Sequence, residues 1–447
     1  MYSEEIEKYL RKKRIKIGDR VRIRKNGQSF EGILMPRIEM GDINSLVIKL
    51  NNGYNIGIEY EKGTEIKKIS SGKSIKYKPA KISLKKDQDK PTVSILGCGG
   101  TIASRVEYRT GAVFPAFSPG DFILAFPELR EIANLEGRKL FSIFSEDMTP
   151  QHWKVTAEEI AKEIKKRING IVVMHGTDTM HYTSAALSFM LQDLPVPVVL
   201  VGTQRSSDRG SSDNAMNLLC SVLTAAKSDI AQVTICMHGS MSDDFCYVHS
   251  GCKVRKLHTS RRDTFRSVNV LPYAKVLYKE RKIEYLRNDF LKVGKRKLKL
   301  DTETNTNVGL IWIHPGIKSE FIESLARFYD GIVIAGTGLG HVPTNMVDKF
   351  TKPILPALKN LINSGIPIAI APQTIYGRLQ MNIYSTGRDL QEIGVIGNNC
   401  DWLPEVCLVK LMWVLGHTKN MNKVKEMMLK NYAGEISERT GVDTFLI

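Results

Sequence analysis

The segment TVSILGCGGTIA, residues 92–103, decides the fold class of this 447-residue chain. It starts as a short apolar run and ends in glycines and a threonine, which is typical of a buried strand followed by a tight turn. Similar runs recur downstream: GIVVMHGTDT (170–179), VPVVLVGTQ (196–204) and QVTICMHG (232–239). Amphipathic segments lie between them, including TAEEIAKEIKKRI (156–168), where Thr156 and Glu159 predict a capping box. This alternation predicts an α/β domain with a parallel sheet.

A second set of short apolar runs predicts a second α/β domain. These runs are VGLIWIHPG (308–316), GIVIAGTGLG (331–340) and IPIAIAPQ (366–373). We therefore expect one domain over 92–280, a polar and basic linker over 281–306, and a second domain with a helical tail over 307–447.

Residues 1–75 follow a different pattern, in which apolar and polar positions alternate between turns. The Asn26-Gly27 and Asn52-Gly53 pairs are typical of two-residue hairpin turns. This pattern predicts a small antiparallel, SH3-like β-barrel. Residues 76–91 are charged, contain two prolines and lack helical periodicity, so we expect a linker there.

The positive charge of the chain is concentrated near its N-terminus. The formal charge is +17, from 64 Lys and Arg against 47 Asp and Glu. Residues 1–90 hold 22 basic and 12 acidic residues, a net charge of +10, which leaves +7 for the other 357. Clustered cations favour a polyanionic partner such as RNA, through counterion release, but a solvated lysine-rich surface has the same composition.

Cysteine content and hydropathy exclude secreted disulfide scaffolds and membrane proteins as classes. The seven cysteines form an odd set without a C-x-x-C pair, and the chain is too long to need disulfides. No apolar run reaches the roughly 20 residues of a membrane span, and the N-terminus lacks the apolar region of a secretory signal. We expect reduced thiols and a cytoplasmic protein that does not contact membranes.

Three polar clusters come directly after predicted strands: Gly97–Thr101, His175–Thr179 and Gly202–Gln204. Each alone is typical of an ordinary strand-to-helix turn. Because the carboxyl ends of parallel strands line one crevice, the three together favour a single site. We expect no metal there, since His175 and His181 are six residues apart and do not form a helical i, i+4 pair.

Gly99-Gly100-Thr101-Ile102-Ala103 and His175-Gly176-Thr177-Asp178-Thr179 resemble the two signatures of the bacterial-type L-asparaginase/glutaminase family. The similarity covers about residues 92–415 and includes a lysine, Lys256, before the segment 264–269. The resemblance implies a two-domain asparaginase-like α/β fold. It also implies that Thr101 is the nucleophile, that Thr177 and Lys256 relay protons, and that Asp178 binds the substrate ammonium. A threonine hydroxyl is protonated at neutral pH and needs such a neighbouring base.

The same resemblance implies three substrate-binding residues. Tyr108 matches the tyrosine of the family's lid, and Ser145 matches a contact to the substrate carboxylate. Glu146 stands where many members have Gln, so the role it inherits is less defined.

Over its full length, the chain resembles the D subunits of the archaeal glutamyl-tRNA(Gln) amidotransferases. The residues that carry this resemblance are the 18–23 strand, the 108–113 loop and the 254–263 run. The resemblance implies a glutaminase subunit that releases ammonia from glutamine or asparagine and passes it to the E subunit of the amidotransferase. The E subunit uses ATP and Mg²⁺ to convert Glu-tRNA(Gln) to Gln-tRNA(Gln), and the D subunit itself has no cofactor. A homodimer inside a heterotetramer is the implied assembly.

Two alternatives remain open at this point. The first is a free-standing cytoplasmic L-asparaginase/glutaminase with an accessory barrel, which would turn over rapidly without a partner or tRNA. The second is an RNA-binding or scaffold protein on an inactive amidase fold. The presence of all four catalytic residues argues against this alternative. The barrel itself can be expected to contact tRNA or to pack against the rest of the chain or the partner.

Overall fold

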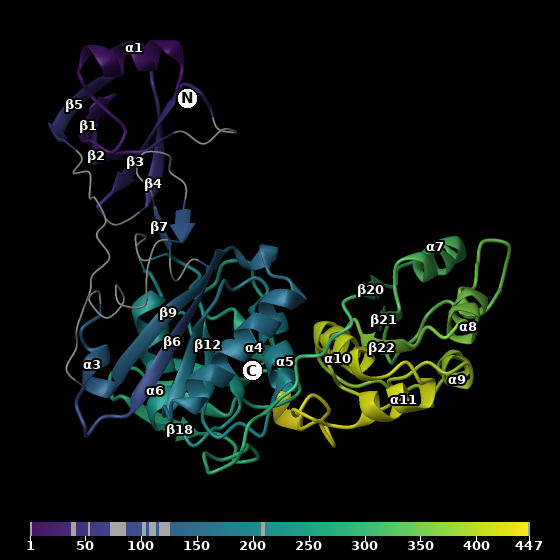
Figure 1. Ribbon diagram of the computed structural model, residues 1–447. Helices are drawn as coiled ribbons and strands as arrows, with labels where there is room; N and C mark the ends of the chain where they lie inside the picture. The colour runs from purple at the N-terminus through teal and green to yellow at the C-terminus, as the bar shows by residue number, and fades with distance from the viewer. Residues whose placement is uncertain are drawn as a thin grey trace.

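The computed structural model describes residues 2–36, 42–51, 54–71, 86–100, 104–106, 113–115, 126–206 and 211–445. The chain forms three units, with a small N-terminal β domain above a large α/β domain and a second α/β domain beside the large one (Figure 1). No helix among the described residues is long and apolar enough to cross a membrane.

The N-terminal unit is an antiparallel sheet under one helix, as the alternating pattern predicts. Its strands are ordered β4-β3-β2-β1-β5, so β4 and β5 form the edges. The bounds are α1 (Glu4–Lys12), β1 (Arg20–Lys25), β2 (Gln28–Leu34), β3 (Ser45–Leu50), β4 (Asn55–Glu59) and β5 (Glu65–Ser70). Asn26 and Gly27 form the predicted two-residue turn between β1 and β2, both with positive φ. The other predicted turn, Asn52-Gly53, lies outside the described residues.

The first α/β domain is built on an eight-stranded sheet with the order β18-β17-β14-β13-β12-β10-β6-β9. The strands are β6 (Thr92–Gly99), β9 (Asn134–Ile143), β10 (Gly170–Met174), β12 (Val198–Val201), β13 (Val233–His238), β14 (Phe245–Ser250), β17 (Ala274–Leu277) and β18 (Lys282–Tyr285). Every residue of β10, β12 and β13 is buried, as expected for strands covered on both faces.

Two expectations for this sheet need correction. The sheet is parallel only from β13 to β9, because β14, β17 and β18 pair antiparallel at the other edge. The segment 281–306 is also more than a linker, since it supplies β18 and the short strand β19 (Lys299–Leu300), which pairs with β11 (Leu191–Gln192). The segment is polar, so the apolar pattern did not predict these strands. An edge strand such as β18 can be polar because some of its side chains face solvent.

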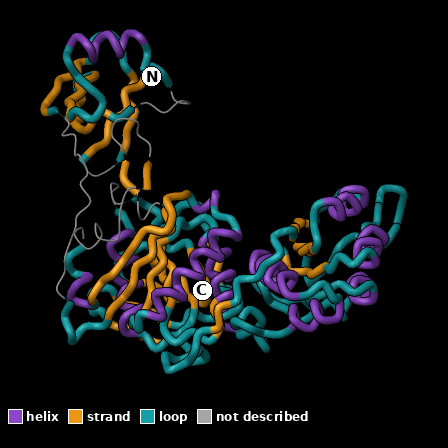
Figure 2. Tube along the Cα trace, viewed as in Figure 1, coloured by secondary structure: helices purple, strands orange, loops and turns teal. Residues whose placement is uncertain are grey.

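Helices surround the sheet and connect its strands (Figure 2). They are α3 (Leu129–Ile132), α4 (Pro150–Lys165), α5 (Met180–Met190) and α6 (Asn214–Lys227), and the short pairs β7 (Ser104–Val106) with β8 (Val113–Pro115) and β15 (Val254–Lys256) with β16 (Phe265–Ser267) complete the domain. The predicted capping box at Thr156 and Glu159 is wrong. The N-cap lies seven residues earlier, at Thr149, which forms the box with His152, and Pro150 is the first residue of the helix.

The second α/β domain has a three-stranded parallel sheet of β20 (Val308–Trp312), β21 (Gly331–Gly336) and β22 (Ile368–Pro372). Its helices are α7 (Ser319–Ser324), η3 (Leu325–Arg327), α8 (Leu355–Asn363), α9 (Ser385–Glu392), α10 (Pro404–His417), α11 (Met421–Leu429) and η4 (Val442–Thr444). Helix α10 packs both on this sheet and on α5 of the first domain. Because α10 touches both domains, it fixes how they meet.

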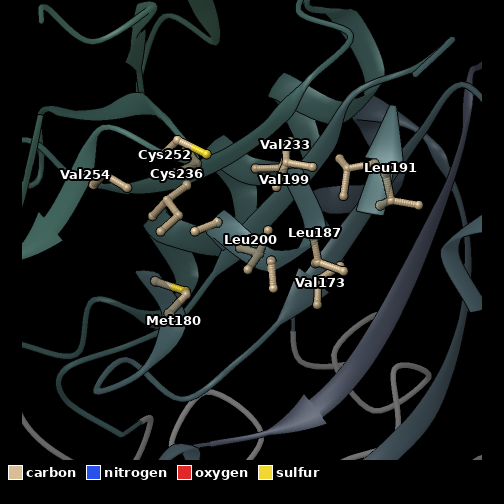
Figure 3. Packing of buried hydrophobic residues seen from close by; sticks show 14 of the residues in the cluster. Val173, Met180, Leu187, Leu191, Val199, Leu200, Val233, Cys236, Cys252 and Val254 are labelled. Atoms are coloured by element: carbon tan, nitrogen blue, oxygen red, sulfur yellow. The ribbon is translucent and has the colours of Figure 1, made fainter. Parts of the chain in front are cut away.

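One apolar core runs from the first domain into α10. Val173 of β10, Leu187 of α5 and Val254 of β15 lie in the same cluster (Figure 3), which also contains Val406 and Leu411 of α10. All seven cysteines are buried free thiols, as predicted. The shared core joins the two domains without a disulfide.

Helix α10 is tied to the C-terminal segment by a buried ion pair. The ammonium of Lys410 lies 2.5 Å from a carboxylate oxygen of Glu435, and both side chains are fully buried. The same ammonium donates to the carbonyls of Met428 and Lys430, each at 2.6 Å. With its hydrogen-bonding capacity satisfied, this pair avoids the penalty of an unpaired buried charge.

Replacing Glu435 with Gln should therefore destabilise the chain strongly. It leaves the Lys410 ammonium buried without a counter-charge, which typically costs about 3–5 kcal/mol. Thermal and denaturant unfolding measure the loss. The control is Asp289→Asn, which removes the exposed partner of Arg287 and should change stability by about 1 kcal/mol or less. Equal effects from the two substitutions would contradict this account of the anchor.

Candidate active site

The ends of β6 and β10 approach each other through glycine backbones. Gly99 and Gly100 have positive φ values of 104° and 79°, which favour glycine. A Cβ at Gly100 would overlap the backbone of Gly176, and one at Gly99 would overlap that of Ile143. The Gly100 amide donates to the Ile143 carbonyl at 3.1 Å. The first two predicted clusters are thus brought together at one edge of the sheet.

Lys256 bridges the two polar residues that follow Gly176. Its ammonium donates to Thr177 Oγ1 at 2.9 Å and to Asp178 Oδ1 at 2.7 Å. Thr177 is buried, the Lys256 side chain is 9% exposed, and that of Asp178 is 65% exposed. The arrangement places a hydroxyl and an amine within proton-transfer distance, with a carboxylate open to a cationic ligand.

Ser145 lies against the same loop. It begins the short helix η2 (Ser145–Asp147), directly after β9. Its hydroxyl accepts from the Asp178 amide at 3.2 Å, and its carbonyl accepts from the Thr179 hydroxyl at 2.6 Å. Glu146, the next residue, is exposed. The structure therefore brings Ser145 to the site, whereas Glu146 faces solvent.

Two predicted residues, Thr101 and Tyr108, lie outside the described residues. The described groups at the site are therefore Thr177, Asp178, Lys256 and Ser145, all of which were expected there from the sequence.

His175 stabilises the loop that carries Thr177 and Asp178 through two hydrogen bonds of its imidazole ring. Burial lowers the pKa of its imidazole to about 4, so the ring is neutral at pH 7. Nδ1 lies 2.6 Å from the Gly176 carbonyl and Nε2 lies 2.9 Å from the Thr183 hydroxyl. A neutral ring satisfies both contacts when Nδ1 donates and Nε2 accepts. The residue holds the turn before Thr177, a role that sequence reasoning did not assign to it.

Of the third predicted cluster, Gly202–Gln204, the glycine adjoins the site and Thr203 does not. A Cβ at Gly202 would press on the Thr177 methyl group, so this glycine adjoins the site. The Thr203 hydroxyl points elsewhere and donates to Asp213 at 2.6 Å. The expectation that all three clusters supply side chains to one site is thus wrong for Thr203, which closes a local loop through Asp213.

Sequence reasoning also missed the charged groups behind Lys256. Arg255 Nε lies 3.3 Å from Glu405 Oε1, and His181 Nε2 lies 3.8 Å from the same oxygen. Burial, with Arg255 and Lys256 nearby, lowers the pKa of His181 to about 3. No local motif could reveal Glu405, which is about 150 positions further along the chain than Arg255. Among the described residues, no group of three His, Cys, Asp or Glu side chains could hold a metal ion.

Comparison with known families matches each of the three units. Residues 92–290 match the family described as "Asparaginase, N-terminal", and residues 307–428 match the "Glutaminase/Asparaginase C-terminal domain". Residues 15–69 match the "GatD N-terminal domain".

Full-length relatives and solved structures agree with these matches. The chain is 49% identical to the D subunit of the glutamyl-tRNA(Gln) amidotransferase of Pyrococcus furiosus, over 99% of this chain and all of that protein. It is 46% identical to the same subunit of Methanothermobacter thermautotrophicus, over 99% of each. The L-asparaginase of Thermococcus kodakarensis is similar in structure, with a TM-score of 0.68, 30% identity, and coverage of 78% of this chain and all of that one. The chain belongs to the asparaginase/glutaminase family and, within it, to the D subunits of the glutamyl-tRNA(Gln) amidotransferases.

Proposed function

We propose that this chain hydrolyses the side-chain amide of glutamine, or of asparagine, and supplies the ammonia for amidation of Glu-tRNA(Gln). The observation that carries the proposal is the bridge from Lys256 to Thr177 and Asp178. The near-full-length match to D subunits supports the tRNA-dependent setting, because a free-standing asparaginase would leave the N-terminal β domain unexplained.

The reaction proceeds in two steps. The Thr101 hydroxyl oxygen attacks the amide carbon, the C–N bond breaks, and ammonia leaves with the proton that Thr101 loses. Water then attacks the resulting ester, which releases glutamate, and one proton of this water restores the Thr101 hydroxyl. Thr177 and Lys256 pass the proton in both steps, since the 2.9 Å contact between them suits transfer.

Asp178 has a second role in this scheme. Its exposed carboxylate binds the substrate ammonium, which then competes with Lys256 for the negative charge of Asp178. Occupation of the site therefore weakens the ion pair that holds Lys256, and once this ammonium has lost a proton to water, its amine can accept the proton of Thr177. Ser145 keeps the Asp178 amide in place and contacts the substrate carboxylate, and Tyr108 completes substrate binding.

The proposed assembly has a second component. The E subunit of the amidotransferase binds ATP and Mg²⁺, activates the glutamate on tRNA(Gln) and receives the ammonia, whereas the chain described here needs no cofactor. A homodimer of this chain forms the centre of a heterotetramer. The reaction takes place in the cytoplasm, where aminoacylated tRNA is used.

Replacing Lys256 with Met should lower kcat for ammonia release from glutamine by about 100-fold or more, the usual effect of losing a general acid–base group. KM should change much less, because the lysine acts on protons. Steady-state ammonia assays measure both values, with Thr101→Ala as the blank that should release none. Lys299→Met removes an exposed lysine distant in sequence from the site and serves as the control. Turnover retained by Thr101→Ala or Lys256→Met would contradict the assigned roles.

Ammonia release should also depend on the partner. We expect glutamine turnover by the purified chain to rise at least about tenfold when the E subunit, Glu-tRNA(Gln), ATP and Mg²⁺ are added together. Omitting each component in turn identifies the one that couples the two reactions. Rapid turnover by the chain alone, unchanged by the full mixture, would instead identify a free-standing amidase.

A further inference from the structure

The strand that carries Lys256 is held from behind by the second α/β domain. Successive residues of a strand point to opposite faces, so Arg255 of β15 faces away from the site that Lys256 enters. The Arg255 guanidinium lies 3.3 Å from the Glu405 carboxylate. Glu405 belongs to the first turn of α10, which starts at Pro404 in the second domain.

A second ion pair holds the start of the same strand. Lys253 Nζ lies 2.7 Å from Asp401 Oδ1 and 3.2 Å from the Asp401 carbonyl, and both side chains are essentially buried. Asp401 is itself fixed, because its Oδ1 accepts from the Ser437 amide at 2.8 Å. The residues on both sides of Val254 are therefore paired with carboxylates only four positions apart, at the start of α10.

Glu405 lies in an environment that lowers the stability of the folded chain, which a purely structural role does not explain. Its residue is 2% exposed, and burial raises the pKa of its carboxyl, an effect that Arg255 partly offsets. Within the described part of the chain, Glu405 Oε1 and the neighbouring His181 Nδ1 are buried without a hydrogen-bond partner. Such groups lower stability and call for another explanation. A buried ion pair can fix a geometry without adding stability.

We propose that Glu405, acting through Arg255 and assisted by the Asp401–Lys253 pair, is a positioning residue for Lys256. It touches neither substrate nor the reacting atoms. It sets the lateral position of β15, so that the Lys256 ammonium meets Thr177 and Asp178 together. A misplacement of about 1 Å in such a group can cost on the order of 100-fold in rate. This inference rests on the proposed proton-relay role of Lys256.

The test compares Glu405→Gln with Glu435→Gln in the full chain, under the conditions in which the wild type releases ammonia from glutamine. Both substitutions replace a buried carboxylate of the second domain with an amide, but Glu435 pairs with Lys410. We expect Glu405→Gln to lower kcat about tenfold or more with less than about a threefold change in KM. Glu435→Gln should lower the unfolding midpoint and leave kcat near the wild-type value in the folded protein.

A double-substitution cycle tests the route of the effect. If Glu405 acts through Arg255, then Arg255→Met should lower kcat similarly, and the double variant should be no slower than either single one. Arg255→Lys keeps the cation and should restore most of the activity. If Glu405→Gln fails to fold, Arg255→Met and Arg255→Lys provide the same comparison, because Arg255 is partly exposed.

Each outcome has a distinct meaning. Wild-type kcat in Glu405→Gln, or equal kcat losses in the Glu405 and Glu435 variants, overturns the positioning role. Additive losses from Arg255→Met and Glu405→Gln overturn the route through Arg255. Full turnover by Lys256→Met would instead refute the proposed function on which this inference rests, so the two failures are separable.

Discussion

The backbone contact between the ends of β6 and β10 is the constraint on which the site depends. Gly100 lies against Gly176 with no room for a side chain between them. Because β6 and β10 are parallel neighbours, this contact sets the two signature loops beside each other. Ser145 also lies close to Gly176, where a Cβ would meet its side chain, so the loop after β9 is fixed by a second close approach. A larger residue at position 100 would separate the loop of Thr177 from the end of β6, and one at position 176 would displace Ser145.

Lys256 reaches this site from outside the group of parallel strand ends. It is the last residue of β15, which pairs with β16 in a two-stranded hairpin whose position does not follow from the register of the main sheet. The hairpin is held by the apolar core through Val254 and by carboxylates of α10 and the residues just before it through Lys253 and Arg255. The second α/β domain thus contributes to the site by holding the hairpin that carries Lys256, although its own sheet does not form the site. This dependence gives a physical reason for one apolar core to extend across both domains.

Sequence reasoning succeeded where the deciding interactions are local. Buried runs of about five residues identified β6, β10, β12 and β13, and strand-end clusters placed Thr177 and Asp178 at one edge. The antiparallel edge from β14 to β18 was missed because its strands are short and partly polar. The pair of Arg255 with Glu405 joins positions about 150 residues apart, and no periodicity encodes such a contact. Lys256 was recognised only through family resemblance, because nothing in the basic sequence around it distinguishes it from a surface lysine.

The distribution of charge bears on what the N-terminal region contacts. Some of the cations in the β domain are paired locally, as Arg20 and Arg22 are with Glu31 and Lys25 is with Glu59 and Glu61. Residues 72–85 contain five lysines and no acidic residue, which is half of the +10 carried by residues 1–90. Of the three aromatic residues available for base stacking, Phe30 and Tyr60 pack against the core, which leaves Tyr54 exposed. The lysines that follow the β domain therefore carry as much of the net positive charge of this region as the domain itself.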